Sequence, residues 1–121
     1  MTHPVIERRR AEQQAHVDRA ASWAAALPDE LGVVAVVVFG SVARGDFNKW
    51  SDIDVLVIAE HLPSSSRDRI EVLFADRPGG LEPVGWTPAE LADRRRRRDP
   101  IAREADEIGV VVRGAWPAPE R

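Results

Sequence analysis

The stretch 33–39, Val-Val-Ala-Val-Val-Val-Phe, constrains the fold more than any other part of this 121-residue chain. An uninterrupted run of mostly β-branched residues is typical of a strand that is buried on both faces. Such a strand needs partner strands at its edges and covering layers above and below it. The sequence therefore predicts a sheet with helices packed against it.

Apolar periodicity and turn residues define the other elements that we expect. Helices are predicted over 4–27, as a short segment from Val42, over 65–74, and over 88–108 with a break at Pro100. Strands are predicted over 33–39, 52–58, 81–86 and 109–113. These elements predict an α+β fold, with one mixed sheet of about four strands. The sequence leaves open whether the strands 33–39 and 52–58 run parallel or antiparallel.

Composition excludes several classes of function. The chain has no cysteine, which excludes disulfides, cysteine-bound zinc and thiol catalysis. It contains no apolar run long enough to span a bilayer, and no apolar stretch follows the basic N-terminal residues, so we expect a cytoplasmic protein. The net charge of −3 does not favour nucleic-acid binding by the protein as a whole.

The five consecutive arginines 94–98 allow two interpretations. They would bind RNA or an acidic partner, or they would form a solvated helix surface that Asp93 and Asp99 partly neutralise. Five successive residues point to all sides of a helix, so they cannot all face one ligand. We favour the solvated surface, and direct nucleic-acid binding remains the less favoured alternative.

Two carboxylates mark the start of the strand predicted over 52–58. Asp52 and Asp54 are two residues apart, so both point to the same face, with Cα atoms about 7 Å apart. Two adjacent like charges are unfavourable unless a cation lies between them. Carboxylate oxygens suit Mg²⁺ or Mn²⁺, and two such ions would activate a hydroxyl and polarise a phosphate. The alternative is a pair of ordinary surface acids.

Gly40 and Ser41 lie where the strand 33–39 leads into a short helix. Free backbone N–H groups at a helix N-terminus bind phosphate, glycine permits close approach, and the serine hydroxyl adds a donor. The chain lacks the Gly-Lys-Ser/Thr of a Walker loop and the Gly-x-Gly-x-x-Gly of a Rossmann turn. The pattern thus predicts a different phosphate site, beside the acidic pair.

Residues 39–58, FGSVARGDFNKWSDIDVLVI, resemble the signature of the DNA polymerase beta-like nucleotidyltransferase superfamily. They most resemble its short members, the minimal nucleotidyltransferases. The resemblance implies that Gly40 and Ser41 hold the β- and γ-phosphates of an NTP, with ATP favoured. It also implies that Asp52 and Asp54 bind metal, with two Mg²⁺ ions expected.

A third carboxylate on a following strand is implied to complete the metal site and to help activate the acceptor hydroxyl. The best candidate is Glu82, near the start of the predicted strand 81–86. It replaces the more usual Asp, and the neighbouring Pro83 weakens the strand assignment. Glu71, in a predicted helix, and Asp76, in a predicted turn, are weaker candidates.

Arg44 has two equally favoured interpretations. It would contact phosphate or substrate, and we therefore group it with the nucleotide-binding residues, or it would pin the loop by pairing with Asp46. Trp50, next to the acidic pair, is a candidate contact for the nucleobase.

The resemblance implies a Mg²⁺-dependent enzyme that transfers NMP, with AMP favoured, from an NTP to an acceptor hydroxyl. Residues 1–121 would form a single minimal nucleotidyltransferase domain, with an N-terminal helix 4–27, a catalytic core 33–86 and a C-terminal helix and strand 88–113. Members of this group pair with helical HEPN-domain toxins, so we expect an antitoxin that adenylylates such a partner, and an oligomer.

Two other functions stay open. The fold would serve as a binding module that neutralises a partner by contact, with weak or no catalysis. Alternatively, the chain would modify a small molecule such as an antibiotic. The sequence does not identify the acceptor, the preferred NTP, the oligomeric state or the partner.

Overall fold

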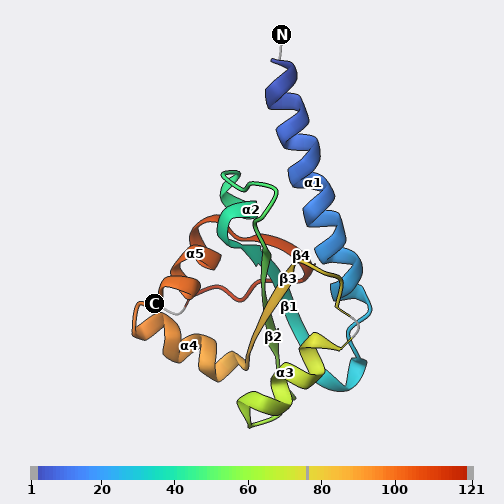
Figure 1. The fold of residues 1–121 in the computed structure, drawn as a ribbon. Helices are drawn as coiled ribbons and strands as arrows, with labels where there is room; N and C mark the ends of the chain where they lie inside the picture. The colour runs from blue at the N-terminus through green and yellow to red at the C-terminus, as the bar shows by residue number, and fades with distance from the viewer. Residues whose placement is uncertain (1–2, 76, 120–121) are drawn as a thin grey trace.

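The computed structural model describes residues 3–75 and 77–119 and is built on one four-stranded sheet (Figure 1). Its strands are β1 (Val33–Phe39), β2 (Ile53–Ala59), β3 (Leu81–Trp86) and β4 (Val110–Gly114). They lie in the order β3-β2-β1-β4. Strand β1 is antiparallel to both β2 and β4, while β2 and β3 are parallel. The sheet is therefore mixed, and the orientation that the sequence left open is antiparallel.

Five α-helices and one 3₁₀ turn accompany the sheet in the described residues. They are α1 (Pro4–Ala25), the 3₁₀ turn η1 (Asp29–Leu31), α2 (Gly40–Arg44), α3 (Ser66–Phe74), α4 (Pro88–Arg96) and α5 (Pro100–Ile108). The first half of α1 extends beyond the end of the sheet (Figure 1). Over these residues, no helix has the length and apolar character needed to cross a bilayer.

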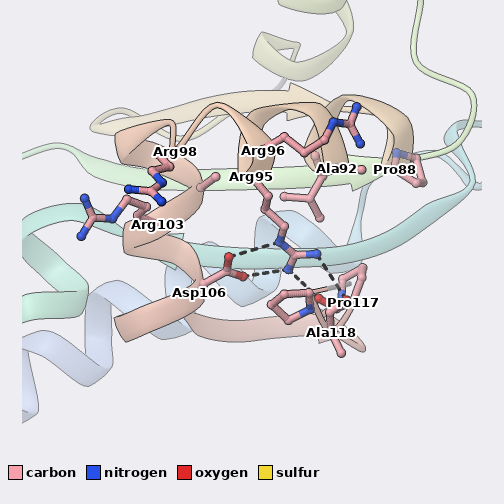
Figure 2. A pocket seen from close by; sticks show the side chains of 12 residues that line it. Pro88, Ala92, Arg95, Arg96, Arg98, Arg103, Asp106, Pro117 and Ala118 are labelled. Atoms are coloured by element: carbon pink, nitrogen blue, oxygen red, sulfur yellow. Dashed lines mark hydrogen bonds and ion pairs between the residues drawn. The ribbon is translucent and has the colours of Figure 1, made fainter. Parts of the chain in front are cut away.

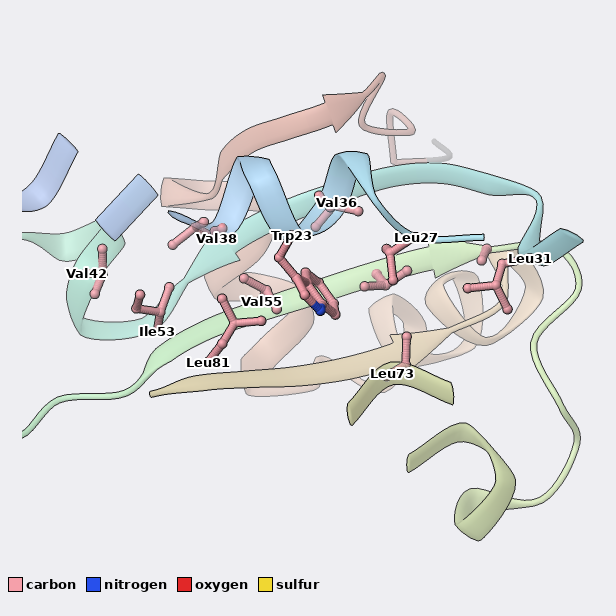
Figure 3. Packing of buried hydrophobic residues seen from close by; sticks show 14 of the residues in the cluster. Trp23, Leu27, Leu31, Val36, Val38, Val42, Ile53, Val55, Leu73 and Leu81 are labelled. Carbon is pink, nitrogen blue, oxygen red and sulfur yellow. The ribbon is translucent and has the colours of Figure 1, made fainter. Parts of the chain in front are cut away.

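Two apolar cores cover the two faces of the sheet. On one face, Trp23 of α1 and Leu27, just after this helix, lie over Val36, Val38 and Val55 (Figure 3). The opposite face packs against α4 and α5. Its buried residues are Val37, Phe39, Leu56, Ile58, Trp86, Leu91, Ala102 and Ala105. Alternate residues of β1 and β2 thus enter different cores, which explains why β1 is apolar throughout and β2 is apolar from Val55 onward.

Most predicted elements form within one or two residues of their expected bounds. The strands over 33–39 and 81–86 have the predicted limits, and the C-terminal helix divides at Pro100. Asp99 caps the second segment by accepting hydrogen bonds from the backbone N–H groups of Ile101 and Ala102. The 3₁₀ turn η1 was not expected. The strand predicted from 52 begins at Ile53, which leaves Asp52 just ahead of β2.

Pro83 is accommodated because β3 lies at the edge of the sheet. A proline lacks the backbone N–H that a central strand needs for hydrogen bonds on both sides, and an edge strand uses only one side. Pro83 aligns with Val55 in the parallel register between β2 and β3. The residue that weakened the sequence prediction therefore fits the strand, and Glu82 takes a defined position on it.

Most of the arginine run is paired within the protein. Arg94 pairs with Asp99, while Arg96 and Arg97 both pair with Asp93. These contacts place compensating carboxylates around an otherwise strongly basic segment.

Arg95 is held more firmly than its neighbours (Figure 2). Its guanidinium forms two hydrogen bonds with the Asp106 carboxylate and also donates to the backbone oxygens of Pro117 and Ala118. These contacts lie at a cavity of about 830 Å³ between α4, α5 and the C-terminal segment. None of Asp52, Asp54 and Glu82 lines this cavity.

Leu91 of α4 provides a test of the second core, since its side chain is 1% exposed. Replacement by alanine should lower the free energy of unfolding by about 2–5 kcal/mol, because it leaves a cavity between α4 and the sheet. Urea denaturation monitored by circular dichroism measures the change. Ile70→Ala on α3, where the side chain is 54% exposed, should change stability far less. Equal effects of the two variants would contradict this packing.

Candidate active site

Gly40 begins α2 immediately after β1 and adopts a left-handed backbone conformation, with φ of 73°. A Cβ atom at this position would overlap with the carboxylate of Asp54. Glycine is therefore needed for two reasons, its positive φ and the close approach of Asp54. The structure places Gly40 directly beside Asp54, and the half-buried Ser41 follows it in α2.

Asp54 lies at the centre of a short acidic cluster. It aligns with Phe39 of β1 on one side and with Glu82 of β3 on the other. Residues in register on neighbouring strands point to the same face, so Glu82 and Asp54 lie side by side on the face covered by α4 and α5. Asp52 precedes the strand by one residue and is exposed. The three predicted carboxylates therefore gather at one end of the sheet.

The environment of Asp54 disfavours its charged form. Burial raises the pKa of the Asp54 carboxyl above its ordinary value. The negative charges of Asp52, Glu104 and Glu82 raise this pKa further. The positive charge of Arg44 lowers it in part. The net result is a carboxyl group that holds its proton more tightly than a solvated aspartate.

Glu104 is a member of this cluster that the motif does not reveal. It belongs to α5, and its carboxylate accepts a hydrogen bond from Arg44, with Nη1 and Oε1 2.5 Å apart. Arg44 also pairs through Nε with Asp46, at 3.2 Å. The loop-pinning contact that we considered from the sequence is thus present, and a second carboxylate joins it. In the sequence Glu104 lies between Ala102 and Ala105, the two alanines that pack α5 onto the sheet, and this spacing was its only signal.

Helix α1 supports the loop that joins α2 to β2. The Arg9 guanidinium donates to the backbone oxygens of Gly45 and Phe47 and lies 4.0 Å from the centre of the Phe47 ring. Gln13 donates to the backbone oxygen of Val42 at 2.7 Å. Phe47 itself is buried. Sequence reasoning assigned no such role to Arg9 or Gln13.

The remaining candidates lie in different surroundings. Glu71 is exposed on α3 and pairs with Arg67. Helix α3 lies at the opposite end of the sheet from α2 (Figure 1). Asp76 lies outside the described residues. Trp50 is 81% exposed, and the Lys49 ammonium lies 5.0 Å from the centre of its ring. Of the three candidates for a third carboxylate, only Glu82 is described beside Asp54.

Comparisons with known proteins identify the family of this chain. A family model described as "Nucleotidyltransferase domain" matches residues 24–112, which include β1, α2, β2 and the acidic cluster. The chain belongs to the nucleotidyltransferase domain family. The resemblance noted for residues 39–58 is thereby confirmed over most of the chain.

Similar proteins carry related names. Two proteins of Methanocaldococcus jannaschii are each named a putative protein adenylyltransferase. One is 46% identical over 67 residues, covering 50% of this chain and 46% of that protein. The other is 38% identical over 42 residues, covering 35% of this chain and 42% of that protein. The matches thus span less than half the length of these relatives.

A solved structure shares the fold. A putative nucleotidyltransferase from Sulfolobus solfataricus superposes with a TM-score of 0.63 at 20% identity, covering 85% of this chain and 84% of that one. At this identity the likeness concerns architecture alone. It confirms the predicted α+β class with a mixed four-stranded sheet.

The acidic cluster of this domain fits a divalent cation by donor type. Asp52, Asp54 and Glu82 offer carboxylate oxygens, which Mg²⁺ prefers, and a cation would offset the repulsion that raises the pKa of Asp54. Over residues 3–75 and 77–119, no three His, Cys, Asp or Glu side chains converge as a complete metal site. Mg²⁺ in proteins usually takes part of its coordination shell from water and from substrate phosphates.

Gly40→Ala tests the close approach of the backbone to Asp54. The alanine would adopt a positive φ and displace the Asp54 carboxylate, so the free energy of unfolding should fall by about 1–3 kcal/mol. Thermal or urea denaturation measures this change. Gly79→Ala is the matched control, because no atom lies within 4 Å of an added Cβ there and its φ is not positive. Comparable losses in both variants would refute the special role of Gly40.

Asp54→Asn tests the electrostatics of the cluster. Because its pKa is raised on folding, the folded state binds this proton more tightly than the unfolded chain does. The stability linked to protonated Asp54 is present below the unfolded pKa and is lost as the pH rises through the folded pKa. In Mg²⁺-free buffer the variant should therefore have a higher Tm than wild type at neutral pH. The difference should shrink as the pH falls below the ordinary range of aspartate.

Differential scanning calorimetry across this pH range provides the measurement. Asp18→Asn, at an exposed site on α1, serves as the control for replacing an aspartate. A Tm difference for Asp54→Asn that stays constant at every pH would contradict the assignment.

Proposed function

We propose that this domain catalyses Mg²⁺-dependent transfer of a nucleotidyl group, with AMP favoured, from an NTP to a hydroxyl group of a protein. The observation that carries the proposal is the alignment of Asp54 with Glu82 across β2 and β3, next to the glycine-serine turn. The names of the two Methanocaldococcus relatives, putative protein adenylyltransferases, support AMP and a protein acceptor.

In the proposed reaction, the acceptor hydroxyl oxygen attacks the α-phosphorus of the NTP. The bond from that phosphorus to the bridging oxygen breaks, and pyrophosphate leaves. A carboxylate oxygen of Glu82 accepts the hydroxyl proton. The backbone at Gly40 and the hydroxyl of Ser41 donate hydrogen bonds to the β- and γ-phosphates, while Arg44 contributes positive charge beside them.

Asp52, Asp54 and Glu82 would hold the metal ions. When bound, two Mg²⁺ ions supply charge stabilisation at the α-phosphate and at the leaving pyrophosphate. The position of Asp54 between Phe39 and Glu82 fixes one of these carboxylates on rigid strands, which favours reproducible placement of the reacting groups.

The biological setting is the finer part of the proposal. The resemblance of residues 39–58 to minimal nucleotidyltransferases supports an antitoxin that adenylylates a HEPN-domain toxin in the cytoplasm, and an oligomeric assembly. One competing candidate is a binding module that neutralises its partner by contact, which the replacement of the more usual Asp by Glu82 favours.

Label transfer tests the proposal directly. The purified protein is incubated with Mg²⁺, each α-labelled NTP and an extract of its own cells. We expect labelling of a discrete protein, strongest with ATP, and loss of labelling in the Asp52→Asn, Asp54→Asn double variant. Label on RNA or on a small molecule would change the acceptor class. If wild type transfers no label while folded and with its partners present, the binding module replaces the enzyme.

The variant Glu82→Gln tests the contribution of Glu82 to the reaction separately from that of Asp52 and Asp54. Loss of a proton acceptor should lower the rate by about 10²–10⁴-fold while the protein remains folded. Glu71→Gln is the matched control, because Glu71 is exposed on α3. Unchanged transfer by Glu82→Gln would remove Glu82 from the proposed mechanism.

A further inference from the structure

We propose that Glu104 of α5 is a positioning residue that holds the Arg44 guanidinium in place for the phosphates of the nucleotide. The inference rests on the proposed function, because it requires a nucleotide that binds beside Arg44. It assigns a part in the site to the C-terminal half of the fold, which lies outside the sequence motif.

Two carboxylates hold Arg44 from different sides. Glu104 accepts from Nη1 at 2.5 Å, and Asp46 accepts from Nε at 3.2 Å. A guanidinium is planar and carries five N–H donors, so contacts at two of its nitrogens fix its orientation. Within residues 3–75 and 77–119, no acceptor is paired with Nη2 of Arg44. That edge of the guanidinium remains available for a phosphate oxygen.

The backbone of Glu104 is well anchored. Ala102 and Ala105, on either side of it, are buried against the sheet, and α5 packs on both β1 and α2. The Glu104 side chain is 28% exposed, whereas that of Glu107 on the same helix is 66% exposed. A semi-buried carboxylate on a packed helix loses little further freedom when it holds its partner, which suits a positioning role.

The pair lies within electrostatic reach of the acidic cluster. The charge of Glu104 raises the pKa of Asp54, and the charge of Arg44 lowers it. An ion pair this exposed contributes little to the stability of the fold. Glu104 also adds a negative charge near Asp52 and Asp54, which gives no advantage if the pair serves stability alone. The unfavourable location of Glu104 is explained if its partner has to be held there for a negatively charged ligand.

A double-mutant cycle tests the proposal. Wild type, Glu104→Gln, Arg44→Gln and the double variant are titrated by calorimetry with α,β-methylene-ATP and Mg²⁺. Glu104→Gln should weaken binding about tenfold, within the range of coupling between groups of one ion-pair network. In the Arg44→Gln background the same change should alter binding less than about twofold, because its partner is gone. Glu107→Gln is the matched control and should bind as wild type does.

Each other result overturns the inference. An equal loss from Glu104→Gln with and without Arg44 would show that Glu104 does not act through Arg44. Tighter binding by Glu104→Gln would show that its charge only repels the nucleotide. Thermal denaturation of all variants identifies any loss that follows from unfolding, and Glu104→Asp, which keeps the charge, should retain more affinity than Glu104→Gln.

Label transfer by the same proteins separates this inference from the proposed function. If the wild-type protein binds the analogue with the expected coupling but transfers no label, the proposed enzyme activity is refuted and the role of Glu104 in nucleotide binding stands. Wild type that transfers label, but shows no coupling, would remove the role of Glu104 alone. Absence of any binding to wild type would overturn both.

Discussion

Burial of β1 and β2 on both faces is the constraint on which the rest of the structure depends. The two strands are antiparallel partners in the middle of the sheet, and their alternate side chains enter two separate cores. A carboxylate cannot be placed along such strands without a large desolvation penalty. The charges therefore gather at the strand ends, where Asp54 is half-buried and Asp52 reaches solvent.

This placement makes the site a region of electrostatic strain. Burial and three nearby carboxylates all oppose ionisation of Asp54, and Arg44 compensates only in part. A protein selected for stability alone would gain by replacing one of these acids with a neutral residue. Their presence, beside a glycine that leaves room for no side chain, is readily understood if a cation and a phosphorylated ligand complete the charge balance.

The sequence predicted the parts of the fold that local patterns determine. The apolar run of β1 and the proline and cap residues of α4 and α5 were sufficient for those elements, and residues 39–58 located the acidic pair. Glu82 was placed correctly on its strand because Pro83 is tolerated at a sheet edge. Glu104 and Arg9 escaped prediction because their contacts join segments distant in the chain, and no short pattern records which side of a helix meets a remote loop.

The hydrogen bonds from Arg9 and Gln13 of α1 to the backbone of α2 and the loop after it have a consequence for substitutions in this loop. Arg9 and Gln13 bind backbone oxygens of Val42, Gly45 and Phe47, which any residue type provides. The exposed side chains of Lys49 and Trp50 are not part of these contacts and can change without removing them. Asn48 and Ser51, in contrast, accept hydrogen bonds within the loop. Two polar residues of a helix far upstream hold the loop backbone. Substitutions at Lys49 and Trp50 can thus change the surface next to the acidic pair while these backbone contacts stay in place.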